Sequence, residues 1–148
     1  MGTQLDSPPI YDVLTKISKD YLSPYWQEWL ASFYQAILQK FINWTTITSS
    51  QNIQVSYGYF CNGIAQLSMA LPSTSDVGDI FRITSITSFG WVITQAPGQQ
   101  IQVRNTTTTL GVGGTLASST IGDAAELVCV VPNLKWMLLS HEGTLAVV

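Results

Sequence analysis

The sequence has few charged residues, a single histidine and two cysteines, and it contains no long apolar run. Only 10% of its 148 residues are charged, against 46% that are hydrophobic, whereas a typical soluble domain carries about 25% charged residues. A monomer therefore has too little polar surface to cover itself, which indicates burial against a membrane or a protein. No window approaches the roughly 18 to 20 apolar residues that a spanning helix requires. We therefore expect a protein partner and no membrane insertion.

Positive charge is scarce, which argues against nucleic acid as a partner. Six Lys and Arg residues leave a net charge of −3, and they are scattered singly instead of forming the basic stripe that phosphate backbones attract. The first nine residues lack the basic segment and apolar core of a signal peptide, so we expect assembly in a cytoplasm. There, Cys61 and Cys129 are more often buried thiols than a disulfide, although maturation outside the cell would reverse this expectation.

The ionisable groups are too few for an enzyme, and we expect no catalytic residue, cofactor or metal. His141 lies in Ser140-His141-Glu142-Gly143, which is typical of a solvated turn between strands. Its neighbour Ser140 would point to the opposite face of a strand, which excludes a Ser-His pair. Neither cysteine has an activating base nearby in sequence, and no Cys-x-x-Cys or His-x-x-x-His spacing is present for zinc.

The composition divides the chain near Trp44. Seven of the fifteen charges and nine of the sixteen aromatic residues fall within residues 1–44, which we interpret as a helical attachment segment, with a β-domain over residues 45–148. Ser7-Pro8-Pro9 is a helix start signal. Apolar residues at helical spacing follow it, at Ile10, Leu14, Ile17 and Tyr21.

A second helix is predicted from Ser23-Pro24, and it is apolar around most of its circumference. Its apolar residues include Tyr25, Trp26, Trp29, Leu30, Phe33, Tyr34, Ile37, Leu38, Phe41 and Ile42. A face this wide must be buried on several sides. Either the helix packs across its own β-domain, or it inserts into a partner or bundles with copies of itself. The predicted attachment or oligomer interface comprises Tyr25, Trp26, Trp29, Leu30, Phe33, Tyr34, Ile37 and Phe41.

From Thr45 onward the hydrophobic period is two, which predicts a mainly β fold. Strands are expected over 52–61, 64–71, 79–86, 91–95, 99–104, 123–131, 135–140 and 144–148, with extended hydroxyl-rich runs over 45–50 and 106–109. Asn62-Gly63 predicts a two-residue hairpin turn, and residues 110–114 predict a glycine-rich loop. Regular short strands of this kind indicate a compact antiparallel β-sandwich or barrel, or one share of a multi-chain β-structure.

Two arginines interrupt these apolar strands. Arg82 and Arg104 would each be costly to bury without a partner, and Asp79, Asp123 or Glu126 are the partners at hand. We expect both side chains to face solvent instead, on the polar side of an amphipathic strand.

An ordered series of short motifs runs through residues 57–148. It comprises Leu71-Pro72, Gly78-Asp79, Gly90-Trp91-Val92-Ile93-Thr94-Gln95, Gly98-Gln99-Gln100-Ile101, Thr108-Thr109-Leu110-Gly111 with Gly113-Gly114, Asp123, Leu127-Val128-Cys129, Trp136, Leu139-Ser140, Gly143 and Val147-Val148. This series resembles the C-terminal β-domain of bacteriophage head-fibre, tail-fibre and related adhesin-like proteins. The resemblance implies a homotrimer without catalytic residues that decorates a particle or contacts host glycans. No repeats or shaft segment accompany it.

The sequence therefore predicts a virion structural protein, a short trimeric fibre or decoration protein attached to a capsid or tail through its N-terminal helices. The alternative is a carbohydrate-binding, lectin-like adhesin that contacts the host surface. The candidate glycan contacts for that alternative are Trp91, Gln95, Gln99 and Gln100, although a tryptophan in such a strand is more often in the core. The predicted core comprises Phe81, Ile83, Trp91, Ile93, Ile101, Val128, Val130 and Trp136.

Overall fold

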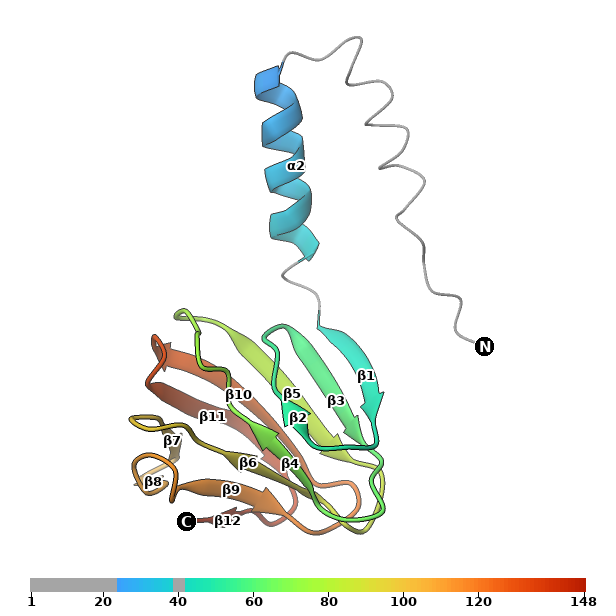
Figure 1. Ribbon diagram of the computed structural model, residues 1–148, viewed down its shortest axis with the longest axis vertical. Coiled ribbons are helices and arrows are strands. Elements are labelled where there is room, and N and C mark those ends of the chain that lie inside the picture. Colours follow the sequence, from blue (N-terminus) through green and yellow to red (C-terminus); the bar gives the residue numbers. More distant parts are fainter. Residues whose placement is uncertain (1–23, 39–41) are drawn as a thin grey trace. The chain divides into compact units, whose positions relative to one another are not determined.

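The computed structural model describes residues 24–38 and 42–148, which belong to two compact units (Figure 1). The first unit comprises residues 1–41, and the helix α2 (Pro24–Leu38) is its described part. The second unit comprises residues 42–148 and holds twelve strands. It begins at Ile42, whereas the sequence pattern places the boundary after Trp44. Asn43 and Trp44 belong to the first strand instead.

Helix α2 starts at the predicted proline. Proline suits a first helical turn because its ring fixes φ and its missing N–H has no helical partner there. Trp26, Trp29 and Phe33 follow at spacings of three and four, which places them on one side of the helix. Within the described residues, no helix has the length and apolar character to span a bilayer. The first predicted helix, over residues 8–21, lies outside the described residues, as do residues 39–41.

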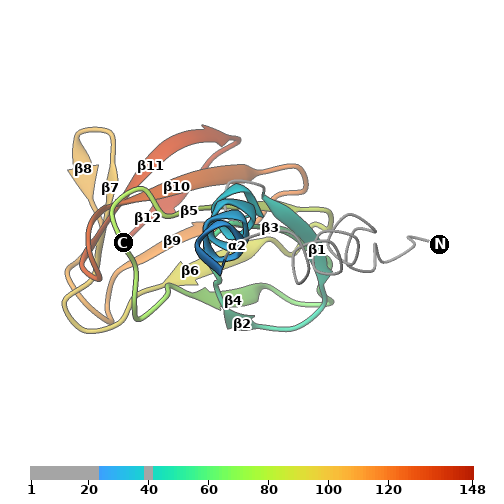
Figure 2. The same cartoon turned by 90° about the horizontal axis from the view of Figure 1, so that it is seen from above.

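The β unit is built from two mixed sheets. The seven-stranded sheet has the order β1-β3-β5-β10-β11-β7-β8, and the five-stranded sheet has the order β12-β9-β6-β4-β2. The strands are β1 (Asn43–Ile47), β2 (Gln51–Asn52), β3 (Tyr57–Cys61), β4 (Leu67–Ala70), β5 (Ile80–Ser85), β6 (Trp91–Thr94), β7 (Gln100–Val103), β8 (Thr106–Thr107), β9 (Thr115–Ser118), β10 (Ala124–Val131), β11 (Lys135–Glu142) and β12 (Ala146–Val147). Figure 2 shows the sheets as separate layers, with β10 and β11 in one and β4 and β6 in the other.

Successive strands from β1 to β7 alternate between the two sheets. Each connection reverses the chain as it crosses, so strands two apart run in the same direction. Up to β6 these strands also pair in parallel, as β3 does with β5 and β4 does with β6. The prediction of antiparallel sheets is therefore wrong for this half of the unit. Antiparallel hairpins do occur later in the chain, between β7 and β8 and between β10 and β11.

The hairpin predicted at Asn62-Gly63 is a crossover. The strands before and after it, β3 and β4, belong to different sheets. A Cβ atom on Gly63 would lie 2.6 Å from the carbonyl oxygen of Ala65, which is closer than a side chain tolerates. Glycine is thus required here by a close backbone approach. The same residue type also occurs in hairpin turns, and this explains the incorrect prediction.

One hydrophobic core lies between the sheets and draws on both. Residues of β5 alternate between half-buried and buried, and Phe81 packs edge-on against Trp136 with ring centroids 5.2 Å apart. Six of the predicted core residues are buried: Phe81, Ile83, Trp91, Ile93, Ile101 and Trp136. Val128 and Val130 are only half-buried, because β10 turns the intervening Leu127 and Cys129 into the core.

Both cysteines are free thiols in this core, as predicted. Burial raises the pKa of Cys61 to about 12, because the interior stabilises a thiolate less than water does. The sulfur of Cys129 lies 3.3 Å from the hydroxyl of Ser75. Cys61 thus behaves as a small apolar side chain, whereas the thiol of Cys129 also donates to the carbonyl oxygen of Val131 at 3.3 Å.

Candidate ligand-binding site on the seven-stranded sheet

The glycan contacts predicted from the sequence are buried, for the most part, in the β unit. Trp91 has no exposed surface, and its indole N–H donates to the carbonyl oxygen of Asp123 at 3.3 Å. Gln95 and Gln99 are 6% and 2% exposed, while half-buried Gln100 donates its amide to the carbonyl oxygen of Thr108 at 2.8 Å. A sugar stacked on Trp91 is therefore excluded, because its ring faces are already covered by the core.

The buried amide of Gln95 holds loops together. Its Nε2 donates to the carbonyl oxygens of Gln99, Thr109 and Gly111 at 2.8, 2.9 and 3.0 Å, and its Oε1 accepts from the hydroxyl of Thr108. Buried polar groups are tolerated when they are hydrogen-bonded in this way. The role of Gln95 is therefore structural.

The register of the seven-stranded sheet brings a different set of residues into one row on its outer face. Trp44 pairs with Gly58, Gly58 with Arg82, Arg82 with Glu126, and Glu126 with Ser140. Paired residues on neighbouring strands project from the same face of a sheet. An aromatic ring, an ion pair and a hydroxyl therefore follow one another across five strands.

Trp44 forms an exposed aromatic shelf at the edge of this row. Its indole lies over Gly58, where a Cβ atom would stand 2.5 Å from the ring, and it stacks against Phe60 with centroids 4.6 Å apart. The side chain remains 46% exposed. The missing side chain at position 58 thus lets the indole lie close against the sheet, while nearly half of Trp44 stays exposed to solvent.

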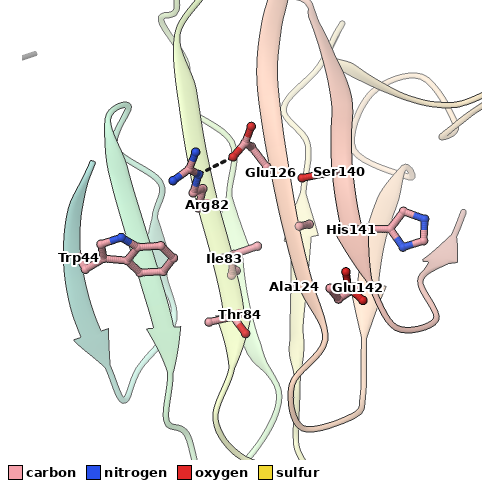
Figure 3. A pocket seen from close by; sticks show the side chains of 10 residues that line it. Trp44, Arg82, Ile83, Thr84, Ala124, Glu126, Ser140, His141 and Glu142 are labelled. Atoms are coloured by element: carbon pink, nitrogen blue, oxygen red, sulfur yellow. Dashed lines mark hydrogen bonds and ion pairs between the residues drawn. The ribbon is translucent and has the colours of Figure 1, made fainter. Parts of the chain in front are cut away.

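A depression of about 160 Å³ opens beside this shelf (Figure 3). Its lining includes the polar residues of the row, Arg82, Glu126 and Ser140. It also includes Thr84, Ala124 and Glu142, which form the next row toward the ends of β5 and β11. The lining residues are Trp44, Arg82, Ile83, Thr84, Ala124, Ala125, Glu126, Ser140, His141 and Glu142.

An ion pair and a second carboxylate set the charge of the depression. Arg82 Nε donates to Glu126 Oε2, and the two side chains are 43% and 22% exposed. The sequence pattern predicts that Arg82 faces solvent without a partner. The side chain instead forms a cross-strand ion pair with Glu126, one of the three candidate partners. Glu142, paired with Ala124 in the next row, is exposed. One cation and two carboxylates leave the lining with one net negative charge.

Arg104 is not inside a strand. It follows β7 in an exposed turn, with φ of 53°.

His141 and Ser140 do not form a catalytic pair. His141 lies in β11 and not in the predicted turn, and Figure 3 shows its imidazole and the Ser140 hydroxyl on opposite sides of that strand. The register explains this, because His141 pairs with the buried Ala125 whereas Ser140 pairs with Glu126. Over residues 24–38 and 42–148, no group of three or more His, Cys, Asp and Glu side chains is placed to hold a metal ion. The arrangement suits binding by stacking and hydrogen bonding.

The predicted attachment residues lie on or beyond helix α2. Trp26, Trp29 and Phe33 are 51%, 47% and 52% exposed, and Leu30 and Tyr34 are half-buried. Tyr25 and Ile37 belong to the helix, but their side chains lie outside the described part, as does the whole of Phe41.

Sequence reasoning missed Trp44 because the composition assigned it to the helical segment. A local signal could have identified it. Trp44 is flanked by the polar residues Asn43, Thr45 and Thr46, and tryptophan and threonine are both common in strands. Comparison with known proteins finds no family model and no curated protein that matches this chain.

Proposed function

We propose that the chain is a bacteriophage virion structural protein, a short trimeric fibre or decoration protein that a helical segment attaches to a capsid or tail. The observation that carries this proposal is the exposed aromatic side of α2. Residues 1–41 would provide attachment, and residues 42–148 would form the trimeric head displayed on the particle.

The aromatic side of α2 is preorganised for docking. Trp26 and Trp29 meet edge-on with centroids 5.6 Å apart, and Trp29 stacks on Phe33 at 5.2 Å with an interplanar angle of 6°. About half of each side chain is exposed. Fully burying a large apolar side chain contributes about 1.5–3 kcal/mol. A cluster of three therefore supports stable docking, and aromatic anchors are typical of interface centres.

The test combines solution mass with particle incorporation. Light scattering after size exclusion should give three times the 16.2 kDa chain mass for the full chain and a trimer for residues 42–148. Particles of the parent phage should incorporate the full chain but neither the truncated chain nor a variant with Trp26→Ser, Trp29→Ser and Phe33→Ser.

A matched control replaces three exposed apolar residues of the β unit, with Ile64→Ser, Val77→Ser and Ile121→Ser, and should still be incorporated. Incorporation of the truncated chain would refute attachment through the helix. A monomer at every concentration would refute the trimer and favour the adhesin described next.

The second candidate function is glycan binding by the β unit, and the Trp44 shelf favours it. A partly exposed indole beside hydrogen-bonding groups suits contact with a sugar ring. Immobilised glycans should retain the protein, and Trp44→Ala should abolish this retention. Trp26→Ala, which removes an exposed tryptophan elsewhere, should not change it. Absence of retention on every glycan at high protein concentration would reject the function.

A further inference from the structure

We propose that the depression beside Trp44 selects an oligosaccharide that carries a free amine over N-acetylated or carboxylated ones. This inference rests on the second proposed function, glycan binding. It concerns the charge and length of the ligand, which follow from the row of residues on the outer face of the seven-stranded sheet.

The expected length of the ligand follows from the spacing between the strands of the sheet. Trp44 lies on β1 and Glu142 on β11, and three strands separate them in the sheet. Four intervals of about 4.8 Å between neighbouring strands give about 19 Å, which exceeds a single sugar ring. The indole extends over Gly58 on β3 and shortens this gap by about one interval. A ligand that contacts both ends of the depression must therefore have more than one ring, with one ring stacked on Trp44.

The expected charge of the ligand follows from the ion pair between Arg82 and Glu126 and from the exposed carboxylate of Glu142. Because Arg82 donates to Glu126, its positive charge is already neutralised. Glu142 is exposed, and no ion pair to it is present among the described residues. The same pair neutralises Glu126, so the net attraction comes from Glu142: an ammonium group placed beside it would be attracted, whereas a ligand carboxylate would be repelled.

Small residues make room for this ring. Ala124 lies between Thr84 and Glu142 in the register, and Ser140 is the register partner of Glu126 on β11. The Ser140 hydroxyl can donate to and accept from a sugar hydroxyl. The amine-bearing ring would thus rest on Ala124, with the carboxylate of its register partner Glu142 beside the amine.

The test uses three tetrasaccharides and isothermal titration at 0.15 M salt, where the Debye length of about 8 Å screens long-range attraction. The three are β-1,4-linked glucosamine, its fully N-acetylated form and a galacturonic acid tetramer. The glucosamine tetramer should bind at least tenfold more tightly than the N-acetylated one, and the galacturonic acid tetramer should not bind. The glucosamine monomer should bind at least tenfold more weakly than its tetramer.

Two variants that remove one negative charge each form a matched pair. Glu142→Gln should reduce the preference for the amine several-fold. Asp76→Asn removes the same charge from an exposed loop at the other end of β5 and should leave the preference unchanged. Trp44→Ala should weaken every sugar, and its circular dichroism and unfolding midpoint should show that the β unit remains folded.

The outcomes separate the two proposals. Equal binding of the amine and N-acetyl forms, lost in Trp44→Ala, would keep glycan binding and overturn the amine selection. Absence of binding by all three sugars would overturn the amine selection, and glycan binding itself would then be decided by the wider set of immobilised glycans. Amine binding that is unchanged in both Trp44→Ala and Glu142→Gln would be attraction to the acidic protein as a whole and would overturn the site.

Discussion

The indole of Trp44 occupies the space that a side chain at Gly58 would take, and a Cβ atom there would stand 2.5 Å from the ring. The two residues are register partners on β1 and β3. This one relationship fixes the shelf at the edge of the seven-stranded sheet and leaves 46% of Trp44 exposed.

Gly58→Ala is therefore expected to displace the ring and destabilise the β unit by about 1–3 kcal/mol, the range for overpacking. Gly113→Ala is the control, because its nearest neighbour, Thr109 Cγ2, is 3.6 Å away, and it should change stability by no more than about 0.5 kcal/mol. Urea unfolding at fixed protein concentration measures both. Equal stability of the two variants would contradict the close contact.

Gln95→Ala should be one of the more harmful single changes. It removes the donor to three carbonyl oxygens and the acceptor of the Thr108 hydroxyl in a buried site, and unsatisfied buried groups cost about 1–3 kcal/mol each. We expect a loss of about 3 kcal/mol or more in the free energy of unfolding.

Gln102, which is half-buried but whose side-chain hydrogen bonds are exposed, is its matched control. It also donates to two backbone carbonyls, of Arg104 and Thr106, at 2.7 and 3.0 Å, but water can replace these bonds. Gln102→Ala should cost no more than about 0.5 kcal/mol. A similar loss for both glutamines would show that burial does not determine the effect.

The Arg82–Glu126 pair should contribute little to stability despite its direct contact. The Arg82 side chain is 43% exposed, and exposed pairs contribute about 0.2–1 kcal/mol. A double-mutant cycle with Arg82→Ala and Glu126→Ala should give a coupling energy in that range, which should decrease in 1 M salt. A coupling above about 2 kcal/mol would mean that the pair is more strongly shielded from water than its exposure indicates.

The Cys61 thiol should resist modification while the protein is folded. Its folded-state pKa of about 12 lies above the ordinary value of 9.0, so at pH 8 the reactive thiolate is scarce. In a Cys129→Ala variant, a chromogenic disulfide should label Cys61 slowly in buffer and rapidly in denaturant. Rapid labelling of the folded protein would contradict the burial.

The same pKa shift has a consequence for stability at alkaline pH. The unfolded chain releases the proton near pH 9 and the folded chain only near 12, so the unfolded state binds fewer protons between these values. The free energy of unfolding should therefore fall as the pH rises from 9 toward 12. Cys61→Ala should show a smaller fall over this range when the unfolding midpoints of both proteins are compared.

The sequence by itself determined the local features of this protein. Pro24 and the spacing of Trp26, Trp29 and Phe33 specify a helix, because its start signal and period are short-range. Alternation in β5 likewise specifies a strand and inward residues such as Phe81, whereas in β10 the near-continuous apolar run predicted the strand but not which side faces the core. The mainly β fold and the burial of both cysteines follow from the same local pattern and from apolar context.

Only the tertiary structure decided which strands are neighbours and which tryptophan is exposed. A glycine at Asn62-Gly63 fits both a hairpin turn and a crossover with a close backbone approach, and the chain takes the crossover, which leads to parallel strand pairs within two mixed sheets. Trp91 and Trp44 both lie in strands, but Trp91 is covered by the opposite sheet whereas Trp44 lies on the outer face over Gly58. The exposure of the two tryptophans differs because burial depends on which residues pack against a strand, and those residues are distant in sequence.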